Sequence, residues 1–573
     1  MDLLLKNANI VDCLKAKSSI SDIAISKGFI KLIKKNIPRG NAQVIDLSGK
    51  YVSPGFIDGH IHIESSLLSP PEFAKLAIRN GTTCVVADPH EIVNVAGADG
   101  FKYMLESSKN LPIDFFFMAP SCVPSTNFET AGGMFGLTQI KKALKNSRVL
   151  GLAEMMNYPG VIHKDPDVIS KITAAQSLDK IIDGHAPGLT GKDLDKYIQA
   201  GITSDHECST LKEAIEKLNK GMWIMIREGS AARNLNALYP IITTHSADKL
   251  MLVTDDKHAD EMVSTGHLNA TIKKAIKLGV DPYMALRLVT FNPAKYFKLQ
   301  NRGEINAGYI ADLVIFDNLE NINVLGTIKD GKIVYANKDL EVNAQKLRIH
   351  SATNKLSKSI TNSVSLPKLS LSSFQVKTPK GYNKKIINCK VIGVIDKEIV
   401  TKKLQHNLQV DSGMVQNNIT KDIIKIAVVE RHGKNGNIGL GFVKGFGMKN
   451  GTLATTIAHD SHNLIIVGTN DKDMLIAAKH IDKTHGGMAI VQNGKVLASV
   501  RLDIAGLMYS GSSNDLISKL DVLNKVIKEK LKTKLTSPFM TLSFLSLPVI
   551  PELKITDKGL FESSTFSICN LFN

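Results

Sequence analysis

The chain has 573 residues, of which 43% are hydrophobic and 22% are charged. At roughly 150 residues per domain this length predicts two to four domains. The ordinary composition excludes intrinsic disorder as a description of the whole chain. No apolar run approaches the roughly 18 residues that a membrane-spanning helix needs. The first residues, MDLLLKNANIVDCLK, lack the basic start of a secretory signal, so we expect none.

The net charge of +17 is concentrated in one part of the chain. Residues 1–345 contain 39 Lys and Arg against 38 Asp and Glu, whereas residues 346–573 contain 32 against 16. Such a surplus suits nucleic-acid or membrane contact, or a lysine-rich surface without a partner. We favour the second interpretation, because no arginine-rich or aromatic-interleaved patch accompanies the charge. We therefore expect neither a nucleic acid nor a membrane as a partner.

The cysteines are too widely spaced to suggest a structural role. None of them forms a Cys-x-x-Cys pair, which argues against a disulfide framework and against a cysteine-ligated zinc site. We expect free thiols in a reducing, cytoplasmic compartment. The six residues are Cys13, Cys84, Cys122, Cys208, Cys389 and Cys569.

Two patterns of apolar runs follow one another from the N-terminus. In residues 1–51, short runs separated by turns predict β-strands of a small domain. Between Val52 and Asp256 eight runs recur, each followed by a helix-like stretch, which predicts an α/β chain with a (β/α)₈ barrel over residues 52–298. A doubly wound sheet is the alternative, but its Gly-rich first turn is absent. The eight runs are VSPGFID, TTCVVADP, DFFFMAP, VLGLAEMM, IIDGHAP, ITSDHE, WIMIREG and LMLVTDD.

Three further segments follow the predicted barrel. Strand-like runs return in residues 299–345, and we expect them to pair with residues 1–51 in one small composite β-sheet domain. From Val342 to Ile395 there is no Asp or Glu, and the stretch LSKSITNSVSLPKLSLSS is rich in Ser and Lys, which predicts a linker or crossing segment over residues 346–388. Alternating strands and helices in residues 389–573 predict a separate α+β domain.

Metal-binding residue types stand at the ends of five of the eight runs. Barrel enzymes carry their reactive groups at the carboxyl ends of the strands, and residues i and i+2 of a strand point to the same side. Any one of these residues alone would be an ordinary rim residue, but the joint pattern predicts a site for two divalent ions with nitrogen and oxygen ligands. The residues are His60 and His62, Glu154, His185, His206, and Asp255 with Asp256.

The segment PGFIDGHIHIESS (54–66), with its His-x-His pair, resembles the amidohydrolase superfamily of metal-dependent barrel hydrolases, and within it the bacterial adenine deaminase family. The resemblance covers nearly the whole chain. It implies hydrolysis of adenine to hypoxanthine and ammonia in purine salvage or catabolism. The other matching segments are GTTCVVADPHEI (81–92), GLAEMMNYPGV (151–161), DGHAPGL (183–189), SDHE (204–207), MIREGSAARN (225–234), LVTDD (252–256) and IAHDSHNLIIVGTND (457–471).

The resemblance also implies a role for each matching residue. Two divalent ions, manganese or iron with zinc as the alternative, would be held by His60, His62, His185 and His206. Glu154 would bridge them in place of the carboxylated lysine of some relatives. Metal-bridging hydroxide would attack C6 of adenine. Asp255, both ligand and proton shuttle, would return the proton of the attacking water to the departing amine.

Several assignments around the purine ring stay open at this stage. Ring nitrogen N1 needs a proton donor, for which Glu207 and Glu91 are the candidates, and Glu91 is equally a helix-start carboxylate favoured by the helix dipole. Arg227 and Glu228 either contact the base or form a buried pair on the rim. Asp256 is a further candidate for substrate contact.

Other polar residues allow a structural or a functional interpretation. His459 and Asp460 either close over the barrel mouth, where they would contact substrate, or cap a helix of their own domain. Asp88 and His90 are expected to orient the ligands. Ser65 and Ser66 are expected to cap the following helix.

Two competing functions remain from the sequence. One is another amidohydrolase activity, such as a cyclic amide hydrolase or an N-acetyl sugar deacetylase, and the other is nucleic-acid binding through the basic C-terminal part. A cytidine-type deaminase is disfavoured, because its His-x-Glu and Pro-Cys-x-x-Cys signature is absent. By analogy with other barrels we expect a homo-oligomer, most simply a dimer.

Overall fold

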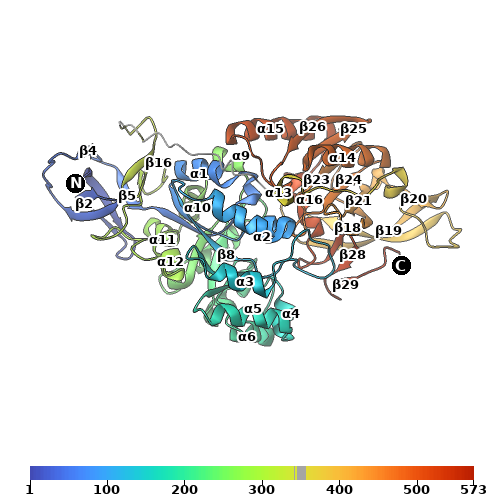
Figure 1. The fold of residues 1–573 in the computed structure, drawn as a ribbon, viewed down its shortest axis with the longest axis horizontal. Helices are drawn as coiled ribbons and strands as arrows, with labels where there is room; N and C mark the ends of the chain where they lie inside the picture. Colours follow the sequence, from blue (N-terminus) through green and yellow to red (C-terminus); the bar gives the residue numbers. More distant parts are fainter. Residues whose placement is uncertain (341, 343, 345–356, 573) are drawn as a thin grey trace.

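The computed structural model describes residues 1–340, 342, 344 and 357–572. The molecule is elongated, with a small sheet at the N-terminal end, a barrel in the middle and a second sheet domain at the C-terminal end (Figure 1). Residues 346–356 of the predicted linker lie outside the described residues. Among the helices of the described ranges, none is long and apolar enough to cross a bilayer.

The small sheet has eight strands and joins two distant parts of the chain. Strand β15 runs antiparallel to β5, with Phe316 opposite Tyr51, as predicted. The small sheet extends to Pro54, beyond the predicted boundary at residue 51, and the first barrel strand begins at Phe56. Leu5, Ile23 and Ile315 are fully buried and belong to its core. The strands are β1 (Leu3–Asp12), β2 (Lys17–Ser26), β3 (Phe29–Lys34), β4 (Gln43–Asp46), β5 (Tyr51–Pro54), β15 (Leu313–Phe316), β16 (Val324–Lys329) and β17 (Lys332–Ala336).

The predicted (β/α)₈ barrel is confirmed. Its strands form a six-stranded parallel sheet in the order β10-β9-β8-β7-β6-β14 and a three-stranded parallel sheet, β11-β12-β13. The Thr203 amide donates to the Ile182 carbonyl at 3.0 Å, which connects the two sheets between β10 and β11. The strands are β6 (Phe56–His62), β7 (Thr82–Ala87), β8 (Asp114–Ala119), β9 (Val149–Met155), β10 (Ile181–Gly184), β11 (Ser204–Asp205), β12 (Trp223–Arg227), β13 (Leu250–Val253) and β14 (Asp255–Asp256).

The eighth run differs from the prediction, because it is divided into two strands at Thr254. Strand β13 pairs with β12, and β14 pairs with β6, so this run closes the ring. The Thr254 hydroxyl donates to the buried carboxylate of Asp58 at 2.6 Å, which fixes the bend. Asp255 follows with a φ of 59°, in the left-handed region that residues other than glycine rarely adopt.

Amphipathic helices cover the barrel. In α1, Phe73, Leu76 and Ala77 are buried at the i, i+3 and i+4 spacing that gives a helix one apolar face. The helices are α1 (Pro70–Arg79), α2 (His90–Ser107), α3 (Leu137–Leu144), α4 (Tyr158–Ile162), α5 (Pro166–Gln176), α6 (Gly191–Gln199), α7 (Leu211–Asn219), α8 (Leu235–Leu238), α9 (Ala259–Ser264), α10 (Leu268–Lys277), α11 (Pro282–Arg287) and α12 (Phe291–Tyr296).

The C-terminal domain is built on a nine-stranded sheet in the order β20-β19-β18-β22-β21-β24-β23-β25-β26. Strand β21, with the sequence IIKIAVV, is buried along its whole length. The strands are β18 (Ile386–Val394), β19 (Thr401–Asp411), β20 (Met414–Val415), β21 (Ile423–Val429), β22 (Ile438–Lys444), β23 (Thr452–Thr455), β24 (Leu464–Gly468), β25 (Gly487–Gln492) and β26 (Lys495–Arg501), and a separate three-stranded sheet holds β27 (Leu553–Thr556), β28 (Gly559–Glu562) and β29 (Ser567–Ile568). The helices are α13 (Lys358–Thr361), α14 (Asp471–Thr484), α15 (Ser513–Val526) and α16 (Pro538–Ser543).

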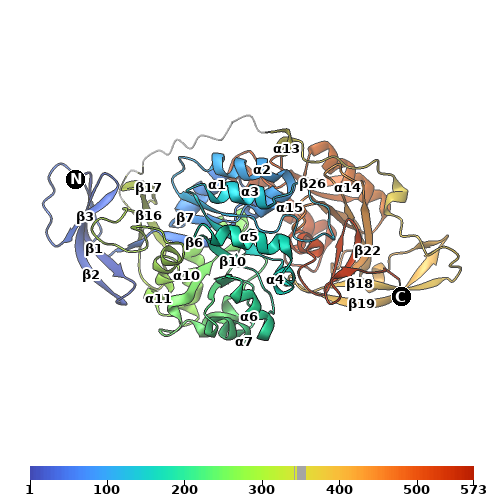
Figure 2. The ribbon, with the colours of Figure 1, turned by 60° about the horizontal axis from the view of Figure 1, so that its bottom comes forward.

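The loop between β8 and α3 attaches the barrel to this domain. Thr130 donates to the carboxylate of Asp557 from its amide, at 2.9 Å, and from its hydroxyl, at 2.7 Å. The side-chain amide of Asn463 donates to the Thr130 carbonyl at 2.9 Å. Figure 2 shows barrel strands β6, β7 and β10 between the small sheet and the C-terminal domain. The polar segment 459–463 is thereby held beside the barrel.

Candidate metal centre and substrate pocket

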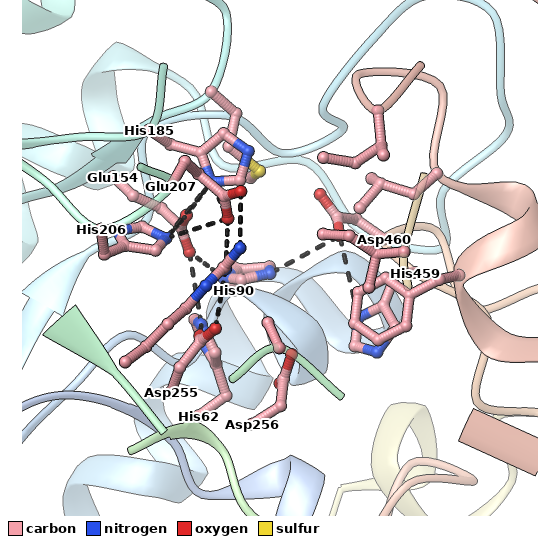
Figure 3. Close-up of a pocket in the computed structure, with 17 residues that line it drawn as sticks. His62, His90, Glu154, His185, His206, Glu207, Asp255, Asp256, His459 and Asp460 are labelled. Carbon is pink, nitrogen blue, oxygen red and sulfur yellow. Dashed lines mark hydrogen bonds and ion pairs between the residues drawn. The ribbon is translucent and has the colours of Figure 1, made fainter. Parts of the chain in front are cut away.

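Six side chains from five barrel strands or their ends meet at one end of the barrel. His60 and His62 lie at the end of β6, Glu154 lies in β9, and Asp255 lies in β14. His185 and His206 directly follow β10 and β11. All six are at most 5% exposed, and Figure 3 shows the labelled members of this group pointing toward one another.

Glu154 lies at the centre of this cluster. Its Oε2 atom is 2.7 Å from Nδ1 of His185 and 3.2 Å from Nε2 of His206. Its Oε1 atom is 3.4 Å from Nε2 of His62. The two carboxylate oxygens therefore face two different groups of histidines, which is the arrangement that a carboxylate bridging two ions requires.

Asp255 completes the second group. Its Oδ1 atom is 3.2 Å from Nε2 of His62 and 3.5 Å from Nε2 of His60. Nδ1 of His62 lies 3.0 Å from the carbonyl oxygen of Asp88. Because a carbonyl only accepts, Nδ1 carries the hydrogen and the lone pair of Nε2 faces the cluster. The backbone carbonyl of Asp88 thus fixes the orientation of the His62 ring.

The donor set fits divalent metal ions. Nε2 of His60 is buried without a hydrogen-bond partner among the described residues, as expected of an atom placed to bind a metal. Burial would raise the pKa of the Glu154 carboxyl, but the charges of His206 and His185 hold it well below its usual value. Burial also opposes ionisation of Asp255, yet Arg227 keeps its pKa well below the usual range. Both carboxyl groups are therefore in the form that binds a cation.

Arg227 forms a buried ion-pair network on the rim and also lines the pocket. Its guanidinium donates two bonds to the carboxylate of Glu207, one of them 2.7 Å from Nη2 to Oε2. A third bond, of 2.9 Å, joins Nη1 to Oδ2 of Asp255. Glu228 points elsewhere and pairs with Lys274 at 2.6 Å. The guanidinium therefore fixes both Glu207 and Asp255.

The two carboxylates considered for ring nitrogen N1 occupy different places. Glu207 lines the pocket, whereas Glu91 is not among the residues that line it. Glu91 lies in the first turn of α2, which begins at His90. Burial, together with the nearby charges of Glu64 and Asp256, raises the pKa of Glu91 well above its usual value.

Ser65 connects Glu91 to the pocket. Its hydroxyl oxygen lies 2.6 Å from Oε1 of Glu91 and 2.5 Å from Oδ1 of Asp256, which lines the pocket. The expected capping role of Ser65 and Ser66 is wrong, because the residue that precedes α1 is Ser69. The chain passes through a short 3₁₀ turn before that helix, so these serines face the buried interior instead.

The C-terminal domain supplies the other side of the pocket. His459 and Asp460 line it, and Figure 3 shows them across the pocket from His185 and His206. Nε2 of His90 lies 3.7 Å from Oδ1 of Asp460, and Nδ1 of His90 lies 3.5 Å from Oε1 of Glu154. His90 therefore connects the metal cluster to the C-terminal domain, in addition to contacting Asp88.

Several lining residues carried no signal in the sequence. The cavity volume of the pocket is about 30 Å³. Part of its apolar lining comes from C-terminal segments that read as ordinary core, and only the docking of the two domains brings them to the barrel. These residues are Ile399, Phe544, Leu547 and Ile550, whereas Met156 directly follows barrel strand β9.

Comparison with known proteins agrees with this division of the chain. Residues 51–334 match the amidohydrolase family, and residues 398–567 match the adenine deaminase C-terminal domain. The chain is 42% identical over 566 residues to an adenine deaminase of Clostridium acetobutylicum, with 98% of this chain and 96% of that protein covered. It is 44% identical over 574 residues to an adenine deaminase of Thermosipho africanus, with 100% and 97% covered.

Proposed function

The chain belongs to the adenine deaminase family of the amidohydrolases and is a hydrolase that acts on a C–N bond of adenine, and on this premise we propose how its residues perform the reaction. Two divalent ions would be held by His60, His62, His185, His206, Glu154 and Asp255. When bound, such ions lower the pKa of water toward about 7 and so supply a nucleophile at neutral pH. The observation that carries the proposal is the position of Glu154, whose two oxygens face separate histidine groups.

Hydrolysis of adenine moves two protons from the attacking water. One goes to ring nitrogen N1 and the other goes to the departing amine, which leaves as ammonia. We assign the amine proton to Asp255, because its carboxylate lies within the ligand cluster and is kept ionised by Arg227. A positioned acid–base group of this kind contributes about 10²–10⁴-fold to the rate.

Glu207 is the group we assign to N1. It lines the pocket, and Oε1 is 3.5 Å from Nδ1 of His185, so it borders the space beside the ligands. Glu91 contacts the Ser65 hydroxyl, which in turn contacts Asp256. Through this hydroxyl, Glu91 would hold Asp256 in a fixed orientation toward the purine. His459 and Asp460 would contact the ring from the C-terminal side.

The nature of the ions is a further part of the proposal. The nitrogen and oxygen ligands suit manganese or iron, with zinc as the alternative. The cytoplasmic location, the homodimer and the absence of a nucleic-acid partner stay predictions.

One purified sample tests the function and the metal site together. We expect the protein to release hypoxanthine and ammonia from adenine, with close to two ions per chain at full occupancy, and to leave hydantoin, dihydroorotate and N-acetyl sugars unchanged. His62→Ala should abolish turnover and lower the metal content. A single tightly bound zinc ion in the fully active enzyme would contradict the two-ion site.

A further inference from the structure

The C-terminal side of the pocket is an apolar wall. It is formed by Ile399, Phe544, Leu547 and Ile550. The ring of Phe544 stacks on the imidazole of His459, with centroids 4.3 Å apart and planes 18° from parallel. Since His459 lies across the pocket from the metal-binding residues in Figure 3, this wall faces the proposed metal centre.

A second, larger cavity lies on the other side of the same wall. Its cavity volume is about 490 Å³, and it is lined by residues of both domains, including Arg233, Asn236 and Thr536. Ile399 and Phe544 line this cavity and also the substrate pocket. These two side chains therefore separate a small pocket from a space that would accept a larger ligand.

Lys554 contacts the backbone of both Ile399 and Phe544. Its ammonium group donates to the carbonyl of Ile399 at 2.6 Å and to the carbonyl of Phe544 at 3.0 Å. The residue is fully buried, and no carboxylate of the described residues lies within ion-pair distance of it. Burying a polar amine here costs free energy that an apolar residue would not cost. A buried lysine without a carboxylate partner is unusual in a protein core. Its position next to a pocket points to a functional constraint.

We propose that Phe544 and Ile399 are specificity-determining residues that restrict the site to purines without a substituent on the N3/N9 edge, and that Lys554 is the positioning residue that fixes them. This inference rests on the proposed function, in which C6 of the purine faces the metal centre. The N3/N9 edge is at the opposite end of the ring system, so it faces the wall. A substituent there would need the volume that the two side chains occupy.

The first test measures kcat/KM for adenine and for 9-methyladenine in the wild type and in Phe544→Ala. One methyl group more or less in an apolar pocket changes the ratio of kcat/KM values for two substrates by about 10- to 200-fold. We expect the wild type to prefer adenine strongly, and Phe544→Ala to reduce this preference at least about tenfold. Phe539→Ala is the matched control, since Phe539 lies in α16, the helix that directly precedes Phe544, and borders a different cavity. It should keep the preference of the wild type.

The second test separates positioning from general stabilisation. Lys554→Met removes both donors, so we expect KM for adenine to rise more than kcat falls and the preference against 9-methyladenine to weaken. Lys554→Gln keeps a hydrogen-bond donor in its side-chain amide. It should therefore restore part of the wild-type KM for adenine and part of the preference against 9-methyladenine. An unchanged preference in Phe544→Ala, or equal changes in Phe544→Ala and Phe539→Ala, would overturn the inference. Failure of the wild type to deaminate adenine would instead overturn the proposed function.

Discussion

Replacing Asp255 by Asn tests the centre of the proposed mechanism with almost no change of volume. The substitution removes the charge beside His62 and His60 and replaces one carboxylate oxygen by an amide nitrogen. Arg227 loses the ionised partner at 2.9 Å but keeps its two bonds to Glu207. The guanidinium is therefore not left unpaired, and we expect the folded state to lose about 1–3 kcal/mol, the cost of one hydrogen bond to a charged group.

The effect on catalysis should be far larger. Loss of a general acid–base group costs about 10²–10⁴-fold, and weakening a metal ligand costs occupancy in addition. We expect kcat/KM for adenine to fall by at least about 10³-fold, which corresponds to roughly 4 kcal/mol of transition-state stabilisation.

The assay follows hypoxanthine by absorbance and ammonia by a coupled reaction, with metal content and Tm measured on the same sample. Asp248→Asn is the control, because this carboxylate is two-thirds exposed on the surface, where it pairs with Arg287. It should leave turnover unchanged. Turnover at the wild-type rate in fully metallated Asp255→Asn would refute the role assigned to Asp255.

Three further outcomes are expected. Chelation should abolish adenine turnover and lower Tm, and titration with manganese should restore both at close to two equivalents; restoration at one equivalent would contradict the paired site. Asp557→Ala removes both hydrogen bonds to Thr130 and should raise KM for adenine several-fold with a smaller change in kcat, whereas an unchanged KM would show that this contact does not position the pocket wall. Burial lowers the pKa of Lys554 from 10.5 to about 7, so between these values the unfolded state binds more protons than the folded state. The free energy of unfolding, measured with urea, should therefore carry a contribution that rises from pH 7 toward pH 10.5 and is missing in Lys554→Met.

The sequence alone predicted the barrel and the six side chains that meet at one end of it. Each ligand type stands at the end of its own apolar run, and the carboxyl ends of parallel strands in a closed barrel meet at one rim. His60 and His206 are far apart in the chain, yet their rings stack with centroids 4.1 Å apart, as that rule requires. The local pattern was sufficient here because the barrel topology converts position along a strand into position in space.

Only the tertiary structure placed Glu207, and not Glu91, in the lining of the pocket, and only it showed that Arg227 pairs with Glu207 and Asp255. Both choices depend on the direction of side chains that follow a strand end, and no periodicity encodes that direction. Glu91 is separated from the pocket by Ser65, whose place results from a turn before α1 that the sequence did not reveal.

The apolar wall is the clearest case of information absent from the sequence. Phe544, Leu547 and Ile550 read as core residues, and within their own domain they do pack together. They become part of a substrate pocket because hydrogen bonds from Thr130 and Asn463 hold the two domains together. The hydrophobic effect is non-directional. An apolar side chain in the sequence therefore predicts that the residue will be buried, but only the docking of the second domain decides which residues bury it.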